Sequence, residues 1–158
     1  MILLGIDPGS RVCGYGAIET ERQRIISIGY DTIKLKPTAP LSDRIEIIYN
    51  KLNQVIKEIK PDVIGVETIF YGKNIQSAFT LGHIRGAILL LVAQNKLPLV
   101  EISPREVKKA VTGNGNASKQ QVQFMLPKLL GVKLDKLPED AADALAVAYS
   151  LYNKERFR

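Results

Sequence analysis

The chain has 158 residues, 46% of them hydrophobic, and 22 lysines and arginines against 16 aspartates and glutamates give a formal net charge of +6. This is enough chain to bury a hydrophobic core without disulfides or structural metals, and we expect one domain over residues 1–158. The single cysteine excludes an intrachain disulfide, and the single histidine excludes a zinc site built from Cys and His ligands.

The net charge and the absence of targeting signals indicate which partners and which cellular location to expect for this protein. A positive net charge favours a polyanionic partner such as nucleic acid, although many soluble proteins are also basic. The N-terminus lacks the pattern of a signal peptide, and the longest uninterrupted apolar run, residues 87–93, is too short to cross a bilayer. We therefore expect a soluble, cytoplasmic protein without a membrane partner.

The first stretch, residues 2–10, is an apolar run that ends in one acid and a Pro-Gly turn. Such a run predicts a buried strand, with Asp7 at the point where the strand emerges from the core. Because burying an isolated carboxylate is costly, an acid in this position normally has a cation, hydrogen bonds or a metal as its partner. Asp7 is the first candidate functional residue.

Two β-rich segments follow, over residues 12–18 and 24–33, and the polar stretch 19–23 between them predicts a turn. We expect the first three strands to form an antiparallel meander. From residue 42 the apolar residues recur at three-and-four spacing, which predicts an amphipathic helix over the sheet. Ser42 and Asp43 are its candidate N-terminal caps, and Pro61 ends it.

A second apolar run, residues 62–70, also carries an acid, Glu67. The strand-helix-strand order predicts that this fourth strand lies parallel to the first, which would place Asp7 and Glu67 at the same edge of the sheet. Adjacent carboxylates repel unless they share a proton or a cation. The pair is therefore an acid/base dyad or part of a metal site, unless the two are unrelated surface acids at strand ends.

The loop after Glu67 contains two aromatic residues and a lysine, Phe70, Tyr71 and Lys73. An exposed aromatic pair beside an acidic site and a lysine is what stacking on an unpaired base requires. The alternative is that the loop aromatics fold back onto the core.

A long helix is predicted over residues 75–95. Ala78, Gly82 and Gly86 lie on one of its faces at four-residue spacing, which permits another backbone to approach closely. That neighbour is either the sheet or a second subunit.

Residues 98–102 predict a fifth strand, and Ser103 with Glu106 forms a capping box for the helix that follows. A Gly/Asn-rich loop over residues 112–118 ends this helix, and another begins at Ser118. Lys108, Lys109 and Lys119 flank the loop and are candidate phosphate contacts, although a solvated lysine face is the alternative for any one of them.

The last predicted helix covers residues 137–149. Asp140 and Asp143 are three residues apart, so they project from one face of its first turn. One acid there would simply favour the helix dipole. Because the same face continues with Ala144 and Val147, we expect both acids to point inward, towards a cation.

Together these motifs resemble the RuvC family of Holliday junction resolvases. The resemblance covers nearly the whole chain and rests on Asp-Pro-Gly after the first strand, Glu67 followed by Phe three residues later, Lys-Asn opening a helix, and the Asp-Ala-Ala-Asp run. It implies an α/β, RNase H-like fold with a five-stranded mixed sheet flanked by helices. Strands one to three would form the antiparallel meander, and strands four and five would lie parallel to strand one.

The resemblance also implies residue roles. The family's catalytic and metal-binding acids fall on Asp7, Glu67, Asp140 and Asp143, and some members have histidine at the last position. Its junction-contacting aromatic falls on Phe70 and its two basic DNA-binding residues on Lys108 and Lys119. The implied protein is a homodimer that makes paired, magnesium-dependent nicks in strands of like polarity at a four-way DNA junction. In its host the family works with the branch-migration proteins RuvA and RuvB.

Elementary chemistry agrees with a metal-dependent nuclease. Two hard divalent ions a few ångströms apart can stabilise the entering and leaving oxygens of phosphodiester hydrolysis, and carboxylates suit Mg²⁺, or Mn²⁺ as a substitute, better than zinc. Three alternatives remain: another RNase H-like nuclease such as the YqgF type, a phosphate-binding lobe of an actin/hexokinase-like ATPase, and a DNA-binding module without activity. The ATPase needs two lobes to enclose a nucleotide, and an inactive module does not need four converging acids.

Overall fold

A five-stranded mixed sheet forms the centre of the computed structural model, which describes residues 1–68, 74–133 and 137–156. Its strands are β1 (Ile2–Asp7), β2 (Val12–Glu21), β3 (Arg24–Lys34), β4 (Val63–Glu67) and β5 (Leu99–Ile102). Their order across the sheet is β3-β2-β1-β4-β5. The first three strands are antiparallel and β4 and β5 run parallel to β1, which confirms the predicted topology.

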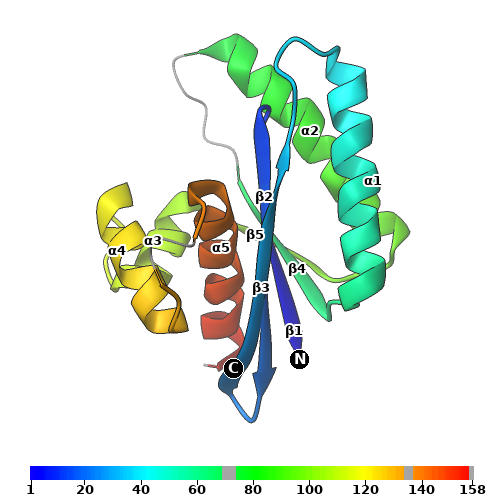
Figure 1. Cartoon of the computed structure of the whole chain (residues 1–158). Helices are drawn as coiled ribbons and strands as arrows, with labels where there is room; N and C mark the ends of the chain where they lie inside the picture. The colour runs from blue at the N-terminus through cyan, green and yellow to red at the C-terminus, as the bar shows by residue number, and fades with distance from the viewer. Residues whose placement is uncertain (69–73, 134–136, 157–158) are drawn as a thin grey trace.

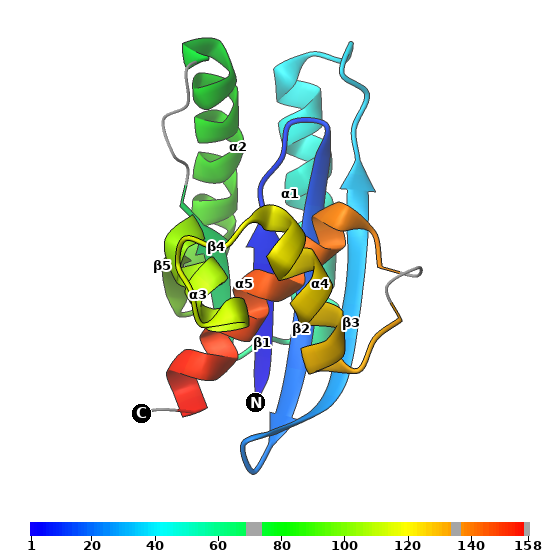
Figure 2. The ribbon, with the colours of Figure 1, turned by 90° about the vertical axis from the view of Figure 1, so that its left-hand side faces the viewer.

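Helices cover both faces of the sheet (Figures 1 and 2). They are α1 (Leu41–Ile59), α2 (Ile75–Gln94), α3 (Pro104–Thr112), α4 (Lys119–Leu130) and α5 (Glu139–Arg156). Helices α1 and α2 pack on one face. On the other face α5 lies directly against β1 and β2, and α3 and α4 pack outside it. Each face has its own buried apolar cluster, so the fold is a three-layer arrangement.

The alternation of side chains along the strands decides which face carries the acids. Leu3 lies in the apolar cluster under α5, whereas Leu4 lies in the cluster under α1 and α2. Since successive strand residues point to opposite faces, Asp7 shares the α5 face with Leu3. On β4, Ile64 belongs to the α1/α2 cluster, so Glu67 also lies on the α5 face.

Two glycines allow α5 to approach the sheet closely. A Cβ atom on Gly5 would lie 2.1 Å from the carbonyl oxygen of Ala144, and one on Gly14 would lie 1.9 Å from that of Asp140. Any larger residue would overlap the α5 backbone at these points. The glycines therefore let the first turns of α5 rest on the ends of β1 and β2, which is where Asp7 lies.

The turn between β2 and β3 is shorter than predicted. The two strands extend to Glu21 and from Arg24, so the predicted five-residue turn shrinks to Arg22 and Gln23. Both have positive φ, 47° and 62°, as in the two-residue turns whose twist matches a hairpin. The polar composition of residues 19–23 reflects an exposed strand end rather than a loop.

The predicted cap of α1 is wrong, whereas the cap of α3 is confirmed. Helix α1 begins at Leu41 with Pro40 as its N-cap residue and no side-chain capping bond, because the helical backbone starts before Ser42. Ser42 and Asp43 thus lie inside the first turn. At α3 the reciprocal hydrogen bonds of Ser103 and Glu106 form the predicted capping box. Helix α5 is also longer than predicted, because its buried face continues through Leu151.

The small-residue face of α2 does not touch the sheet. The buried residues of this helix are Ile84, Ile88, Leu91 and Val92, whereas no described atom lies within 4 Å of a Cβ atom built on Gly82 or Gly86. By length and composition α2 is apolar enough to cross a membrane, a test that apolar helices of soluble proteins also pass. Only 22% of its apolar window is buried, so much of its apolar surface is exposed.

Candidate active site

Four acidic residues lie near one another where β1 and β4 end and α5 begins. Asp7 and Glu67 are the last residues of two parallel strands whose register pairs Ile6 with Val66, so the acids are neighbours at one edge of the sheet. Asp140 and Asp143 lie in the first turn and a half of α5, which Gly14 allows to rest on β2 beside Asp7. The structure therefore brings together the four acids predicted from the sequence.

Burial and mutual repulsion raise the pKa of the strand acids. Burial raises the pKa of Asp7 to about 8, with further contributions from the charges of Glu67, Asp143 and Asp140. Burial likewise raises the pKa of Glu67 to about 7, helped by the charge of Asp143 and opposed by Lys119 and Lys108. Ionising all four acids at neutral pH thus calls for a compensating cation.

Lys119 supplies part of that positive charge. Its Nζ lies 3.1 Å from Oδ2 of Asp143 and 2.7 Å from Oε1 of Glu139. The hydrogen bonds that Lys119 donates to Glu139 and to Asp143 raise the pKa of Lys119 and keep it charged. Burial still raises the pKa of Asp143 above its usual range, because the lysine offsets only part of the desolvation. One lysine is thus too little charge for the four acids.

A pocket of about 260 Å³ opens beside the acids, between the end of β4 and helices α3, α4 and α5. It is lined by Glu67, Pro104, Val107, Lys108, Lys119, Val122, Asp143 and Ala146. Two acids and two lysines thus face an otherwise apolar pocket. Such a pocket can hold a phosphate between the ammonium groups while the acids hold a cation against it.

The donor chemistry fits a hard divalent ion. The neighbouring groups are carboxylates, and burial together with the charges of the other acids raises the pKa values of Asp7 and Glu67, an effect that a divalent ion would oppose. Within the described ranges, no three His, Cys, Asp or Glu side chains are already close enough to form a complete metal site. Oδ2 of Asp143 is paired with Lys119, so an ion that bound through this oxygen would compete with the lysine.

The other predicted site residues fall into two groups. Lys108 and Lys119 line the pocket beside Glu67. Phe70, Tyr71 and Lys73 lie outside the described residues. Glu139, which was not among the predicted site residues, pairs with Lys119 from one turn before Asp143. The only sequence signal for it is the four-residue spacing of two acids on a helix.

Comparison with known proteins identifies the family to which the chain belongs. The family model described as "Crossover junction endodeoxyribonuclease RuvC" matches residues 3–150. The chain belongs to the RuvC family. This confirms the resemblance inferred from the sequence motifs. Family membership also favours a crossover junction endodeoxyribonuclease over a YqgF-type nuclease or an ATPase lobe.

Individual relatives match over nearly their full length. The chain is 42% identical to the RuvC protein of Carboxydothermus hydrogenoformans over 154 residues, covering 98% of this chain and 97% of the relative. It is 47% identical to that of Chloroherpeton thalassium, covering 94% of this chain and 80% of the relative. Among solved structures, Thermus thermophilus RuvC in complex with a Holliday junction substrate superimposes with a TM-score of 0.90 at 28% identity. That match covers 99% of this chain and 96% of the T. thermophilus chain.

Proposed function

We propose that this protein is an endodeoxyribonuclease that resolves four-way DNA junctions by paired phosphodiester hydrolysis during recombination and repair. The observation that carries the proposal is the convergence of four carboxylates beside a lysine-lined pocket in a chain of the RuvC family. The T. thermophilus relative, seen with a Holliday junction substrate, supports the choice of substrate. We take residues 1–158 to act as a single RNase H-like nuclease domain in the cytoplasm.

Asp7, Glu67, Asp140 and Asp143 would hold the catalytic metal. All four offer oxygen donors, which suit Mg²⁺, with Mn²⁺ as a substitute, and four carboxylates are enough for two ions. When bound, the ions would stabilise the charges that develop on the entering and leaving oxygens of the phosphodiester. Asp143 is the acid whose role depends on Lys119, because the two are already paired.

Lys108 and Lys119 would hold the scissile phosphate. Both line the pocket beside Glu67, and their ammonium groups can donate to phosphate oxygens without providing a metal ligand. The pKa of Lys119 lies above its usual range, so this group stays charged across the pH range of a cell. For Phe70, Tyr71 and Lys73 we keep the prediction that they contact unpaired bases and phosphates at the junction centre.

We further propose that the protein is a homodimer formed through α2. The open face of this helix exposes Phe79 (66%) and Leu90 (55%), with the unobstructed Gly82 and Gly86 between them. An apolar stripe with small residues at its centre suits close packing against a second copy. A dimer would carry two active sites, as paired cutting requires. RuvA and RuvB are the partners that family membership suggests.

Substrate preference tests the proposed function. Purified protein is incubated with Mg²⁺ and a four-way junction, a linear duplex of the same sequence, or a duplex that contains an RNA strand. A resolvase cuts the junction and leaves both linear substrates intact. Cleavage of the RNA-containing duplex in preference to the junction would instead indicate another RNase H-like nuclease.

A further inference from the structure

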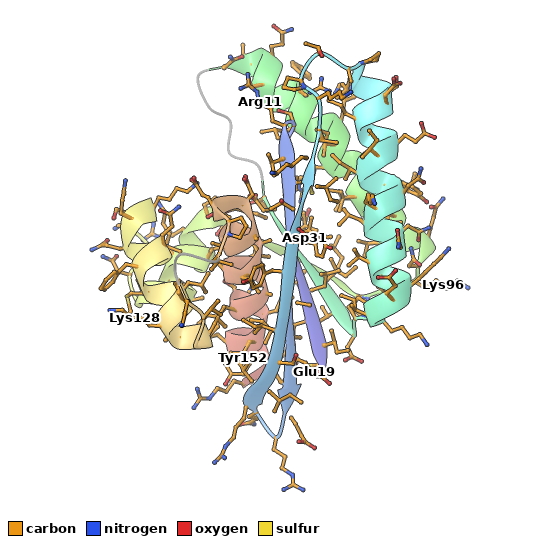
Figure 3. All side chains as sticks on the ribbon, in the orientation of Figure 1. Arg11, Glu19, Asp31, Lys96, Lys128 and Tyr152 are labelled. Carbon is orange, nitrogen blue, oxygen red and sulfur yellow. The ribbon has the colours of Figure 1, made fainter. Side chains whose placement is uncertain are left out.

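A second groove, of about 260 Å³, lies at the end of the molecule where α1 and α2 begin, on the opposite side of the sheet from α5. Its lining residues are Ser10, Arg11, Pro37, Arg44, Asn74, Gln76, Ser77 and Thr80. Figure 3 places Arg11 at the end of the strands, beside the first turns of α2. Two arginines and several neutral hydrogen-bonding residues thus face one groove, and none of its described lining residues is acidic.

Among the described residues, Arg44 has no acidic partner for its charge. Its Nη1 donates to the carbonyl oxygen of Ser10 at 3.0 Å, but its Nε is buried without a hydrogen-bond acceptor among the described residues. Within the same ranges no carboxylate forms an ion pair with Arg44 or Arg11. A partly buried guanidinium without a counter-charge is unfavourable, so an anion in the groove would stabilise it.

The start of α2 adds to the positive potential. Asn74 caps this helix by accepting a hydrogen bond from the Ser77 N–H at 3.1 Å, and both residues line the groove. The first turn of α2 contains no acidic residue, so no charge there offsets the positive end of the helix dipole. The dipole and the two guanidinium groups therefore favour the same charge in the groove.

We propose that this groove binds a phosphodiester group of the DNA strand that leads away from the active site. The inference rests on the proposed function. Arg11 follows Asp7 by only four residues, so the two Cα atoms are at most about 14 Å apart. A nucleic acid strand covers that distance in roughly four nucleotides at about 3.4 Å each. Arginine suits such a contact because its planar group can donate two parallel hydrogen bonds to one phosphate.

Salt-dependent binding of a labelled four-way junction tests the groove. Binding is measured in EDTA, which prevents cleavage, for the wild-type protein and for the double variant Arg11→Gln, Arg44→Gln. Loss of one phosphate contact lowers the slope of log affinity against log salt by about 0.9. The double variant should show this change and bind roughly tenfold more weakly at low salt. Lys57→Gln, at the other end of α1, is the matched control and should bind like the wild type.

Each result has a defined meaning. If Arg44→Gln disturbs folding through loss of its bond to Ser10, Arg11→Gln alone carries the test, because no hydrogen bond of the Arg11 side chain exists within the described part of the chain. If the double variant shows the same salt dependence and affinity as the Lys57→Gln control, the groove does not bind a DNA phosphate. If the wild-type protein binds and cuts junctions in that case, only the groove is rejected. A wild-type protein that neither binds nor cuts them rejects the proposed function as well.

Discussion

The ammonium nitrogen of Lys119 lies 3.1 Å from Oδ2 of Asp143, so a cation already occupies one side of the acid cluster. Glu139 holds the same nitrogen at 2.7 Å. A divalent ion that bound Asp143 through Oδ2 would compete with this ion pair, and a released lysine would be free to contact a phosphate. Under the proposed function, Lys119 would serve both as a counter-charge to Asp143 and as a phosphate contact.

Lys119→Gln should strengthen Mg²⁺ binding to the DNA-free protein by at least several-fold. The substitution removes a competing positive charge within a few ångströms of the metal ligands, where one unit charge is worth on the order of 1 kcal/mol or more. Isothermal titration with Mg²⁺ measures the change. Lys108→Gln is the control, because Lys108 affects Glu67 only through its charge and should have a smaller effect. Unchanged or weaker Mg²⁺ binding by Lys119→Gln would show that the ion pair does not compete with metal.

Asp7→Asn should reduce junction cleavage at least 100-fold, which corresponds to about 2.7 kcal/mol of transition-state stabilisation. Asn keeps the shape of the side chain but cannot supply the negative charge that a divalent ion needs. Cleavage is followed on a labelled junction with Mg²⁺, and binding of the same junction in EDTA should persist. Retained cutting by Asp7→Asn would remove Asp7 from the catalytic site.

The metal-free protein should lose stability as the pH rises. The pKa of Asp7 is about 8 in the folded chain against an ordinary 3.8, and that of Glu67 is about 7 against 4.5. Because both values are raised by folding, their stabilising contribution is complete below pH 4 and is lost progressively up to about pH 8. Urea unfolding in EDTA at pH 5 and pH 8.5 should differ by on the order of 3 kcal/mol or more.

Two controls belong to this pH experiment. Asp7→Asn should flatten the pH dependence, and saturating Mg²⁺ should raise stability at pH 8.5 in the wild-type protein alone, because the ion replaces the missing countercharge. Glu106, whose pKa is lowered to about 2 by its capping bonds with Ser103, changes the stability only below its ordinary pKa of 4.5, which lies under the two pH values compared. Equal stability at both pH values in EDTA would mean that the acids are not buried together.

Gly14→Ala should destabilise the protein by about 2 kcal/mol or more and disturb the site together with the fold. The new methyl group would lie 1.9 Å from the carbonyl oxygen of Asp140, so α5 would have to move away from β2. Gly29→Ala is the matched control on β3, because no described atom lies within 4 Å of its Cβ position. Thermal unfolding compares the two variants. Equal melting temperatures would contradict the close approach of α5 to the sheet.

Leu90→Glu should convert the proposed dimer to a monomer or raise its dissociation constant more than tenfold. Burying a leucine contributes about 1.5–3 kcal/mol, and a charge in an apolar interface opposes association further. Light scattering after size-exclusion chromatography measures the mass of each variant. Ile26→Glu, which alters an exposed apolar residue of β3, should leave the mass unchanged. A wild-type protein that is monomeric at micromolar concentration would refute the dimer.

The sequence predicts the sheet and the placement of the four acids at its edge because both depend on local patterns. An apolar run that stops at Asp7 or Glu67 indicates a strand and a strand end together, and the chain between them is long enough for one helical crossover. Asp140 and Asp143 follow from helical spacing. These signals need no knowledge of distant contacts.

Features that depend on tertiary contacts were not predictable in this way. The pairing of Lys119 with Glu139 joins two helices whose relative placement the sequence does not specify. Helical periodicity places Gly82 and Gly86 on one face of α2 but cannot say whether the sheet or a second subunit covers it. The prediction of the α1 cap was wrong because serine and aspartate are favourable both at a cap position and in the first turn, where Ser42 and Asp43 lie.

Strand-specific nicking of a four-way junction tests the central claim most directly. Each of the four strands is labelled in turn, and the junction is incubated with wild-type protein, with Asp7→Asn, or with wild-type protein in EDTA. We predict that wild-type protein with Mg²⁺ makes nicks at symmetric positions in two strands of like polarity, and that the other two reactions make none. Binding without cleavage under Mg²⁺ or Mn²⁺ would contradict the account and leave a junction-binding protein with the fold of a nuclease.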